Sequence, residues 1–283
     1  MKKKRYLGSA FIRLLCGLCA SLTAGALALL VGYILLTGVP HLSASLFSPV
    51  YTSENVSLLP ALFNTLILTL VALAVAAPLG VGGAIYLAEY AHRQSKLVKA
   101  VRLTAETLCG IPSILYGLFG MMVFVLTLRW GYSLLGGGMT LAVMILPLIL
   151  RTTEEALLSV PDSYREGSFG LGAGKLRTVV RIVLPSAKGG IAAGLILSIG
   201  RVVGETAALI YTAGTVADFP DGLMASGRTL AVHMYVLSGE GLHVGEASAT
   251  AVTLLAIVAG MNALSALLIQ KSAKGENHGK NHR

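Results

Sequence analysis

Long apolar stretches alternate with short polar ones along most of this 283-residue chain. A helix that crosses the hydrocarbon core of a bilayer needs about 20 predominantly apolar residues. Six stretches come close to or exceed that length, and we predict transmembrane helices at residues 11–37, 60–89, 107–128, 136–153, 190–214 and 246–270. The pattern therefore predicts an all-α integral membrane protein with six transmembrane helices.

The composition fits a lipid environment. Hydrophobic residues make up 55% of the chain and charged residues only 12%, about half the share that an ordinary soluble domain carries. The lipid bilayer is therefore the first partner that we expect.

The net charge of +9 raises nucleic acid as an alternative partner. However, the basic residues gather at residues 2–5, 93–102, 165–188 and 271–283. The intervening loops on the other side hold only Arg129 and Arg228, together with the acidic Glu54, Asp218, Asp221, Glu240 and Glu246. Cytoplasmic loops of membrane proteins carry an excess of Lys and Arg. An even number of crossings with both termini in the cytoplasm explains the charge, so nucleic acid is not expected.

The N-terminal region raises the question of a signal peptide. Its apolar run from Phe11 to Leu36 exceeds the 7–15 residues of a signal-peptide core, so we expect a retained first helix. The segment at 38–60 is rich in Pro, Ser and Thr and predicts an irregular external loop, which would leave that helix peripheral. We therefore divide the chain into an N-terminal part at 1–59, a permease core at 60–270 and a cytoplasmic tail at 271–283.

A polar segment at about 154–189 separates the fourth and fifth predicted spans. Pro161-Asp162-Ser163 has the residues of a helix start, and Ser163 with Glu166 has the spacing of a capping box. Apolar residues follow at helical spacing from Leu171 to Val183. We expect a cytoplasmic helix-turn-helix that presents a surface to a partner.

The same segment carries a recognisable motif. Glu166-Gly167-Ser168 is followed by three residues, Gly172, nine residues and Ile182-Val183-Leu184-Pro185. This spacing resembles the EAA motif of type I ABC importer permeases, with small residues in place of the two alanines. The resemblance implies a type I permease fold with a cytoplasmic coupling helix that docks on a separate ATPase. It assigns the coupling role to Arg165, Glu166, Gly172, Leu184 and Pro185; the alternative is a solvated amphipathic loop.

The glycines of this segment also suggest a phosphate-binding loop. That pattern would require Gly at position 169 and Ser or Thr at 176, where the chain has Phe169 and Leu176. We therefore expect no cofactor in this chain, with ATP and Mg²⁺ bound by the partner ATPase. Neither the cysteines nor the histidines form a catalytic cluster in the sequence, so no enzymatic activity is expected.

Two charged residues lie within the fifth predicted span. Arg201 and Glu205 are four positions apart, which would place them on one helix face within reach of each other. A lone charge at the bilayer centre costs at least about 2.5–3.5 kcal/mol, so such residues usually line a pathway or pair with each other. We expect an anion pathway at this pair; the alternative is an ion pair that fastens the helix to another subunit.

Four segments together resemble the PstA family, the permeases of phosphate-specific importers: residues 84–90, 111–120, 150–155 and 200–207. The resemblance implies transport of inorganic phosphate across the bacterial inner membrane, with Arg201, Glu205 and Thr206 on the substrate pathway. It also implies a second, PstC-like permease, a PstB-like ATPase dimer and a PstS-like extracytoplasmic phosphate-binding protein as partners.

Two rival functions stay open at this point. A permease of the same fold could carry molybdate, sulfate or an organic solute, because the coupling motif would serve any of them. An ion-coupled secondary transporter could use Glu205 as a titratable gate, although the chain lacks the internal repeat common in such proteins. In the external segment at 218–245, His233 and His243 favour docking or plain surface over a metal site.

Overall fold

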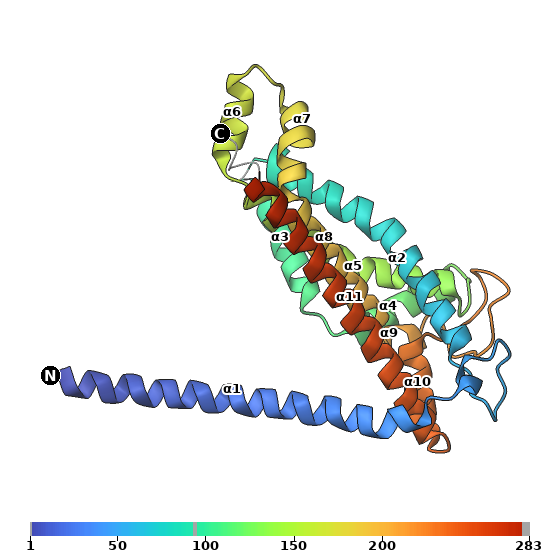
Figure 1. Ribbon diagram of the computed structural model, residues 1–283. Helices are drawn as coiled ribbons and strands as arrows, with labels where there is room; N and C mark the ends of the chain where they lie inside the picture. Colours follow the sequence, from blue (N-terminus) through green and yellow to red (C-terminus); the bar gives the residue numbers. More distant parts are fainter. Residues whose placement is uncertain (1, 93–94, 279–283) are drawn as a thin grey trace.

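The computed structural model describes residues 2–92 and 95–278. Helices form the regular structure of these residues (Figure 1). The α-helices are α1 (Lys2–Gly38), α2 (Leu59–Ile85), α3 (Lys96–Cys109), α4 (Ser113–Gly120), α5 (Leu134–Leu158), α6 (Asp162–Gly170), α7 (Lys175–Thr178), α8 (Leu184–Val203), α9 (Ala207–Ile210), α10 (Leu230–Glu240) and α11 (Val244–His278). Three π-helical turns extend these helices. Turn η3 (Tyr86–Tyr90) continues α2, and turn η4 (Met121–Thr127) continues α4. Turn η5 (Val179–Val183) joins α7 to α8.

Five helical stretches are long and apolar enough to cross a membrane, and a bent pair brings the number to six. The five are Phe11–His41, Leu59–Tyr90, Leu134–Leu158, Lys175–Val203 and Val244–Ala263. The all-α membrane fold and the first, second, fourth and sixth predicted spans are thus confirmed, with shifts of a few residues at their ends.

The third predicted span, 107–128, is wrong at its start. Lys96–Cys109 and Ser113–Thr127 are bent by 102° relative to each other, so the predicted span runs across a sharp elbow. Pro112 explains the break, because proline lacks an N–H and forces the preceding residue into an extended conformation. The hydroxyl of Tyr116 donates a hydrogen bond to the carbonyl of Leu108 at 2.9 Å and holds the elbow closed.

The fifth predicted span, 190–214, is wrong at both ends. A continuous helical stretch runs from Lys175 to Val203, so the second half of the expected helix-turn-helix is the beginning of this span. The π-helical turn η5 lies directly before Pro185 and accommodates the hydrogen bond that this proline cannot make. At the other end the helix stops at Val203, well before residue 214.

The protein core lies where α2, α5 and α8 pack together. Small residues allow their backbones to approach closely: Gly194 of α8 lies against Thr152 of α5, and Gly80 of α2 lies against Ile149. Leu68, Ile145 and Leu209 are fully buried in the same central cluster. The glycines of these spans thus lie where two helices approach each other closely.

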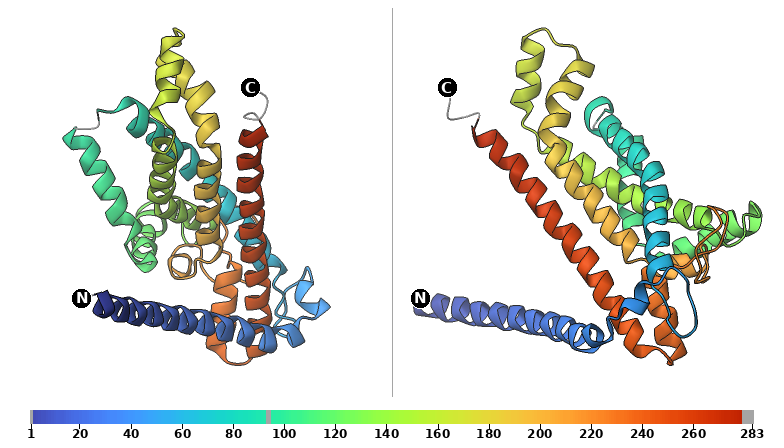
Figure 2. Two further views of the ribbon diagram at one scale, coloured as in Figure 1. Left: turned by 60° about the vertical axis from the view of Figure 1, so that its left-hand side comes forward. Right: turned by 45° about the vertical axis from the view of Figure 1, so that its right-hand side comes forward.

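The first helix leaves this core at a steep angle (Figures 1 and 2). None of the apolar window in Phe11–His41 is buried, which agrees with a peripheral position. The loop after it is irregular but well packed, because Leu46, Val56 and Leu58 are buried against α10 and α11. The hydroxyl of Ser57 also donates to the carbonyls of Leu46 and Ser48.

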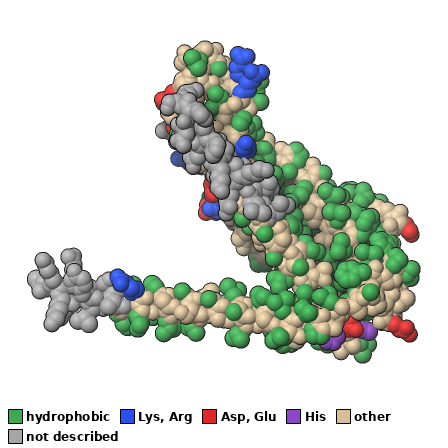
Figure 3. Space-filling model, viewed as in Figure 1, with side chains coloured by type: hydrophobic (Ala, Val, Ile, Leu, Met, Phe, Trp, Pro, Cys, Tyr) green, Lys and Arg blue, Asp and Glu red, His purple; other side chains and the backbone are tan. Residues whose placement is uncertain are grey.

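The two ends of the bundle differ in charge. We call residues 162–178, which contain α6 and α7, the hairpin; it projects from one end, and α10 lies at the other (Figure 1). Figure 3 shows Lys and Arg side chains on the hairpin, whereas the α10 end shows Asp, Glu and His side chains in this view. The last described residues of α11 lie toward the hairpin end (Figure 2). Of the predicted tail at 271–283, residues 271–278 continue α11, and residues 279–283 lie outside the described residues.

Candidate functional site

The helix that carries Arg201 ends two residues later, at Val203. Arg201 lies in the last turn of α8, Gly204 follows as the C-terminal cap, and α9 begins at Ala207. We call residues 204–206 the helix break. The N–H of Gly204 donates to the carbonyl of Gly200, and the N–H of Glu205 donates to that of Val202. The break thus sets Arg201 and Glu205 on two different elements.

The alternative interpretation, an ion pair between Arg201 and Glu205, is not found among the ion pairs of the described residues. Glu205 is buried, and its Oε1 atom accepts a hydrogen bond at 3.0 Å from the N–H of Ala208 in α9. No carboxylate of the described residues lies within 4.0 Å of the half-buried Arg201. Within residues 2–92 and 95–278, the membrane-spanning part thus holds a cation that has no internal counter-ion.

Two further groups lie at the helix break. Thr206 is half-buried and precedes the first residue of α9, where its carbonyl accepts the N–H groups of Leu209 and Ile210. Tyr116 of α4 lies close enough to Arg201 for its phenol to be within the electrostatic field of the guanidinium. Gly117 packs directly against the backbone of Ala208, so α4 covers α9 at this point. Tyr116 belongs to a segment that the sequence singles out, but only the fold places it beside Arg201.

The hairpin has the backbone of a tight turn. Gly172 adopts φ +80°, the left-handed conformation that glycine takes at no steric cost. Its N–H donates to the carbonyl of Phe169, and the hydroxyls of Ser168 and Thr178 are hydrogen-bonded at 2.8 Å across the turn. The small residue at 168 therefore lies inside the hairpin, as close packing of its two arms requires.

The predicted capping box is wrong. Helix α6 begins at Asp162 with Pro161 as its N-terminal cap, and no side chain bonds the free N–H groups. Pro161 adopts the extended conformation that precedes a helix, so α6 begins two residues earlier than it would with Ser163 as its cap.

The outer surface of the hairpin is apolar and lacks a partner among the described residues. Tyr164, Phe169, Leu171 and Leu176 are exposed, and Leu171 is almost fully accessible. A groove of about 770 Å³ runs between α6 and η5, lined by residues that include Gly167, Leu171, Gly172, Arg177 and Arg181. Glu166 is exposed on the same hairpin.

The other three motif residues do not share this surface. Leu184 is half-buried and packs against a cluster of Ala84, Leu157 and Val183, while Pro185 follows it inside the α8 span. Arg165 points inward, where its guanidinium pairs with Glu89 of η3 at 2.7 Å. The hairpin surface therefore carries Glu166 and Gly172, whereas Arg165, Leu184 and Pro185 belong to its attachment.

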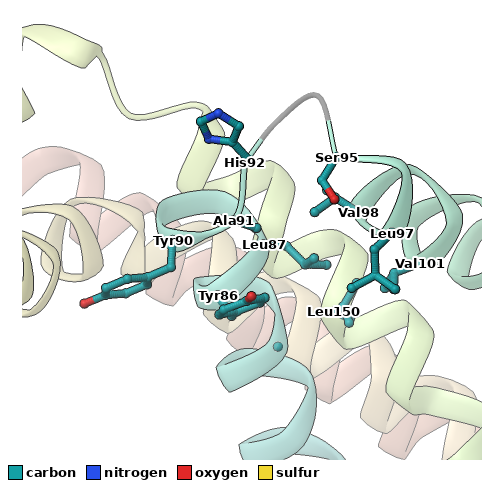
Figure 4. Close-up of a pocket in the computed structure, with 11 residues that line it drawn as sticks. Tyr86, Leu87, Tyr90, Ala91, His92, Ser95, Leu97, Val98, Val101 and Leu150 are labelled. Carbon is teal, nitrogen blue, oxygen red and sulfur yellow. The ribbon is translucent and has the colours of Figure 1, made fainter.

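A cavity of about 400 Å³ lies beside this attachment, between the end of α2 and the start of α3 (Figure 4). Tyr86, Leu87, Tyr90, Leu97 and Val101 supply most of its apolar wall. None of its described lining residues is Arg or Lys.

At the opposite end, Arg228 and His233 are buried together. Arg228 is 4% exposed and lies over the ring of Tyr51 at 4.9 Å, and the same ring meets His233 edge-on. Burial, and secondarily the charge of Arg228, lowers the pKa of His233 to about 3, so this imidazole is neutral near pH 7. The expected surface position of His233 is wrong. His243 lies 3.7 Å from Glu246, and the described residues contain no cluster of three potential metal ligands.

Comparison with known proteins decides the family. Residues 80–274 match the family described as "Binding-protein-dependent transport system inner membrane component". The chain belongs to this family of ABC importer permeases. It is a transport subunit and not an enzyme, and its family implies an ATPase, a substrate-binding protein and a second permease as partners.

Named relatives agree with this family. The chain is 36% identical over 244 residues to a probable ABC transporter permease, YqgI, of Bacillus subtilis, covering 80% of this chain and 82% of the relative. It is 37% identical to the phosphate transport system permease PstA of Mycobacterium leprae, covering 73% and 68% of the two chains.

Solved structures support the fold alone. The permease in the inward-facing MetNI methionine ABC transporter superposes with a TM-score of 0.59 at 19% identity, over 75% of this chain and 93% of that one. An amino acid ABC transporter superposes with a TM-score of 0.55 at 16% identity, over 75% and 92% of the two chains. The type I importer permease fold of this chain is thereby confirmed.

Proposed function

We propose that this permease provides half of the membrane pathway by which an ATP-driven importer brings inorganic phosphate into a bacterial cell. The observation that carries the proposal is the guanidinium of Arg201, which has no counter-ion among the described residues and lies at a helix break within the spans. A guanidinium is always charged and offers a fork of donors that suits a phosphate oxyanion. The mycobacterial relatives named as phosphate permeases support the same ligand.

The helix break supplies groups suited to such a ligand. Arg201 and Thr206 flank Gly204, which carries no side chain and is exposed. Glu205 is occupied by the N–H of Ala208, so its carboxylate contributes to the structure of the break. In this proposal Arg201 attracts the anion, Thr206 donates from its hydroxyl, and Glu205 fixes the turn that presents both.

The proposal extends to orientation and partners. The exposed Lys175, Arg177 and Arg181 on and beside the hairpin support a cytoplasmic hairpin and cytoplasmic termini in the inner membrane, because basic residues favour the cytoplasmic side. Glu166 and the apolar hairpin surface would meet a PstB-like ATPase dimer, which holds ATP and Mg²⁺. A PstC-like permease would complete the pathway, and a PstS-like protein would deliver phosphate at the α10 end.

The experiment is reconstitution of the chain with these three partners in proteoliposomes. We expect ATP-dependent uptake of radiolabelled phosphate. Excess unlabelled phosphate should suppress this uptake, whereas uptake in the presence of excess sulfate or molybdate should stay within about twofold of the rate without competitor. Suppression by sulfate or molybdate in place of phosphate would support the same-fold rival. Uptake by the purified chain without the ATPase would support the secondary transporter, and either result would overturn the proposal.

A further inference from the structure

The inward-pointing Arg165 occupies an unusually complete binding site for a guanidinium. Its Nε and Nη2 atoms donate to the carboxylate of Glu89, the latter at 2.7 Å. Nη1 donates to the carbonyl of Val160 and to Asp162, and Nη2 also donates to the carbonyl of Leu157. Every nitrogen of the guanidinium thus has an acceptor.

The pair with Glu89 is buried, whereas the pair with Asp162 is not. The side chains of Arg165 and Glu89 are 13% and 7% exposed, while that of Asp162 is 67% exposed. Removing either member of a buried pair leaves the other charge in a poor solvent, whereas an exposed pair contributes little. The rigid contact is therefore the one between Arg165 and Glu89.

This contact joins three elements, of which only α5 and α6 are neighbours along the chain. Glu89 lies in η3 at the end of the α2 span, Leu157 lies in the last turn of α5, and Arg165 lies in the middle of α6. Apart from this link, α6 packs mainly on α7 and η5. A single guanidinium therefore ties the hairpin to the ends of two spans.

The α2 span continues from this contact to the helix break. Leu68, Ala72 and Ala76 of α2 belong to the same buried cluster as Val202 and Leu209, which lie on either side of residues 204–206. A displacement of Glu89 along the axis of α2 would thus reach the residues that flank Arg201 through packed side chains.

We propose that Glu89 and Arg165, with the carbonyls of Leu157 and Val160, form a transmission joint that makes α2 move with the hairpin when the ATPase closes. The proposal rests on the importer function and assigns Arg165 a positioning role, acting through Glu89 and not by touching the ATPase. Arginine is required because lysine supplies the charge without the fork that reaches Glu89 and both carbonyls together.

The test compares variants of the complete importer complex in proteoliposomes. Glu89→Gln and Arg165→Lys weaken the joint, the double exchange Glu89→Arg with Arg165→Glu restores opposite charges, and Asp162→Asn removes only the exposed partner of the same guanidinium. The quantity measured is phosphate imported per ATP hydrolysed, with assembly checked by gel filtration. We expect a fall of at least tenfold in this ratio for both single variants, partial recovery in the exchange, and a change within twofold for Asp162→Asn.

If assembled Glu89→Gln and Arg165→Lys complexes import as much phosphate per ATP as the wild type, the proposed transmission joint is wrong. An equal fall of the phosphate-to-ATP ratio in Asp162→Asn would also overturn the proposal, because the loss would then arise from the exposed surface of the hairpin and not from the contact with Glu89. Hydrogen exchange at residues 84–90, with and without ATP and vanadate, tests the joint without any substrate. We expect a nucleotide-dependent change in the wild type that is lost in Arg165→Lys; the same change in both would contradict the joint. Failure of the wild-type complex to import phosphate would instead count against the proposed substrate.

Discussion

The guanidinium of Arg165 has two carboxylates and two carbonyls around it, whereas that of Arg201 has no carboxylate within 4.0 Å among residues 2–92 and 95–278. Both arginines lie next to the end of a span, and both come from segments that resemble importer motifs. A charge whose acceptors are all internal holds the protein together, and a charge without them is available to something from outside. The comparison separates a joint from a candidate substrate contact.

The largest expected effect concerns stability at the joint. Glu89→Gln leaves the buried guanidinium of Arg165 without its main counter-ion, so we expect a loss of about 3 kcal/mol or more. Thermal unfolding of the purified complex in detergent measures this loss. Arg201→Gln, in contrast, removes no internal partner, and we expect a change within about 0.5 kcal/mol. Equal losses in the two variants would break the comparison.

A third arginine, Arg228, differs from both because it is buried beside a second basic side chain, that of His233. His233 has a folded pKa of about 3 against an ordinary value of 6.5, so the unfolded chain binds more protons between these values. Stability is complete above pH 6.5 and falls as the pH drops toward 3, by about 2 kcal/mol at pH 5.

The measurement is the unfolding temperature of the wild type and of His233→Gln at pH 7.5 and pH 5. The unfolding temperature of the wild type should fall more between pH 7.5 and pH 5 than that of His233→Gln. A pH dependence that is identical in both would exclude His233 as its source.

A smaller effect is expected at the hairpin turn. Gly172→Ala places a side chain at φ +80° and costs about 1–2 kcal/mol, although the added methyl group meets no atom within 4 Å. The matched control is Gly167→Ala, which lies in α6 with the same open space and should be neutral or slightly stabilising. Phosphate imported per ATP should fall in the first variant only. A normal ratio in Gly172→Ala would remove the turn from the coupling mechanism.

The smallest effect is expected at Glu205. Glu205→Gln retains an oxygen that accepts the N–H of Ala208, so we expect stability to change by less than about 0.5 kcal/mol and uptake to fall no more than threefold. Glu205→Ala removes that acceptor and should cost about 1 kcal/mol, read as a lower unfolding temperature. A complete loss of uptake in Glu205→Gln would show that the carboxylate charge acts in transport.

Much of the fold could be predicted from the sequence because spans are long apolar runs and the hairpin motif has fixed spacing. The helix break could not, since Gly204 resembles the many glycines that continue membrane helices in this chain. Without the break, Arg201 and Glu205 would fall on one helix face, which is why the sequence suggested that they lie within reach of each other. The elbow at Pro112 was visible only as a proline inside an apolar run.

The contact between Glu89 and Arg165 could not be predicted from the sequence for a different reason. Glu89 and Arg165 are 76 positions apart, and no local pattern indicates that the end of α2 and the middle of α6 meet. The motif assigns Arg165 a role but does not indicate whether its side chain points toward the spans or toward the outer surface of the hairpin. Only the packing of α2, α5 and α6 shows that its side chain faces inward, away from the surface that carries Glu166.

The most direct test of the central claim is phosphate uptake by the reconstituted complex carrying Arg201→Gln. Loss of a charge-assisted contact of about 2–3 kcal/mol predicts a fall of about 30- to 160-fold in uptake, with normal assembly and an unchanged unfolding temperature. Arg13→Gln, an exposed arginine on α1, should remain within twofold of the wild type. Wild-type uptake by an assembled Arg201→Gln complex would contradict the account.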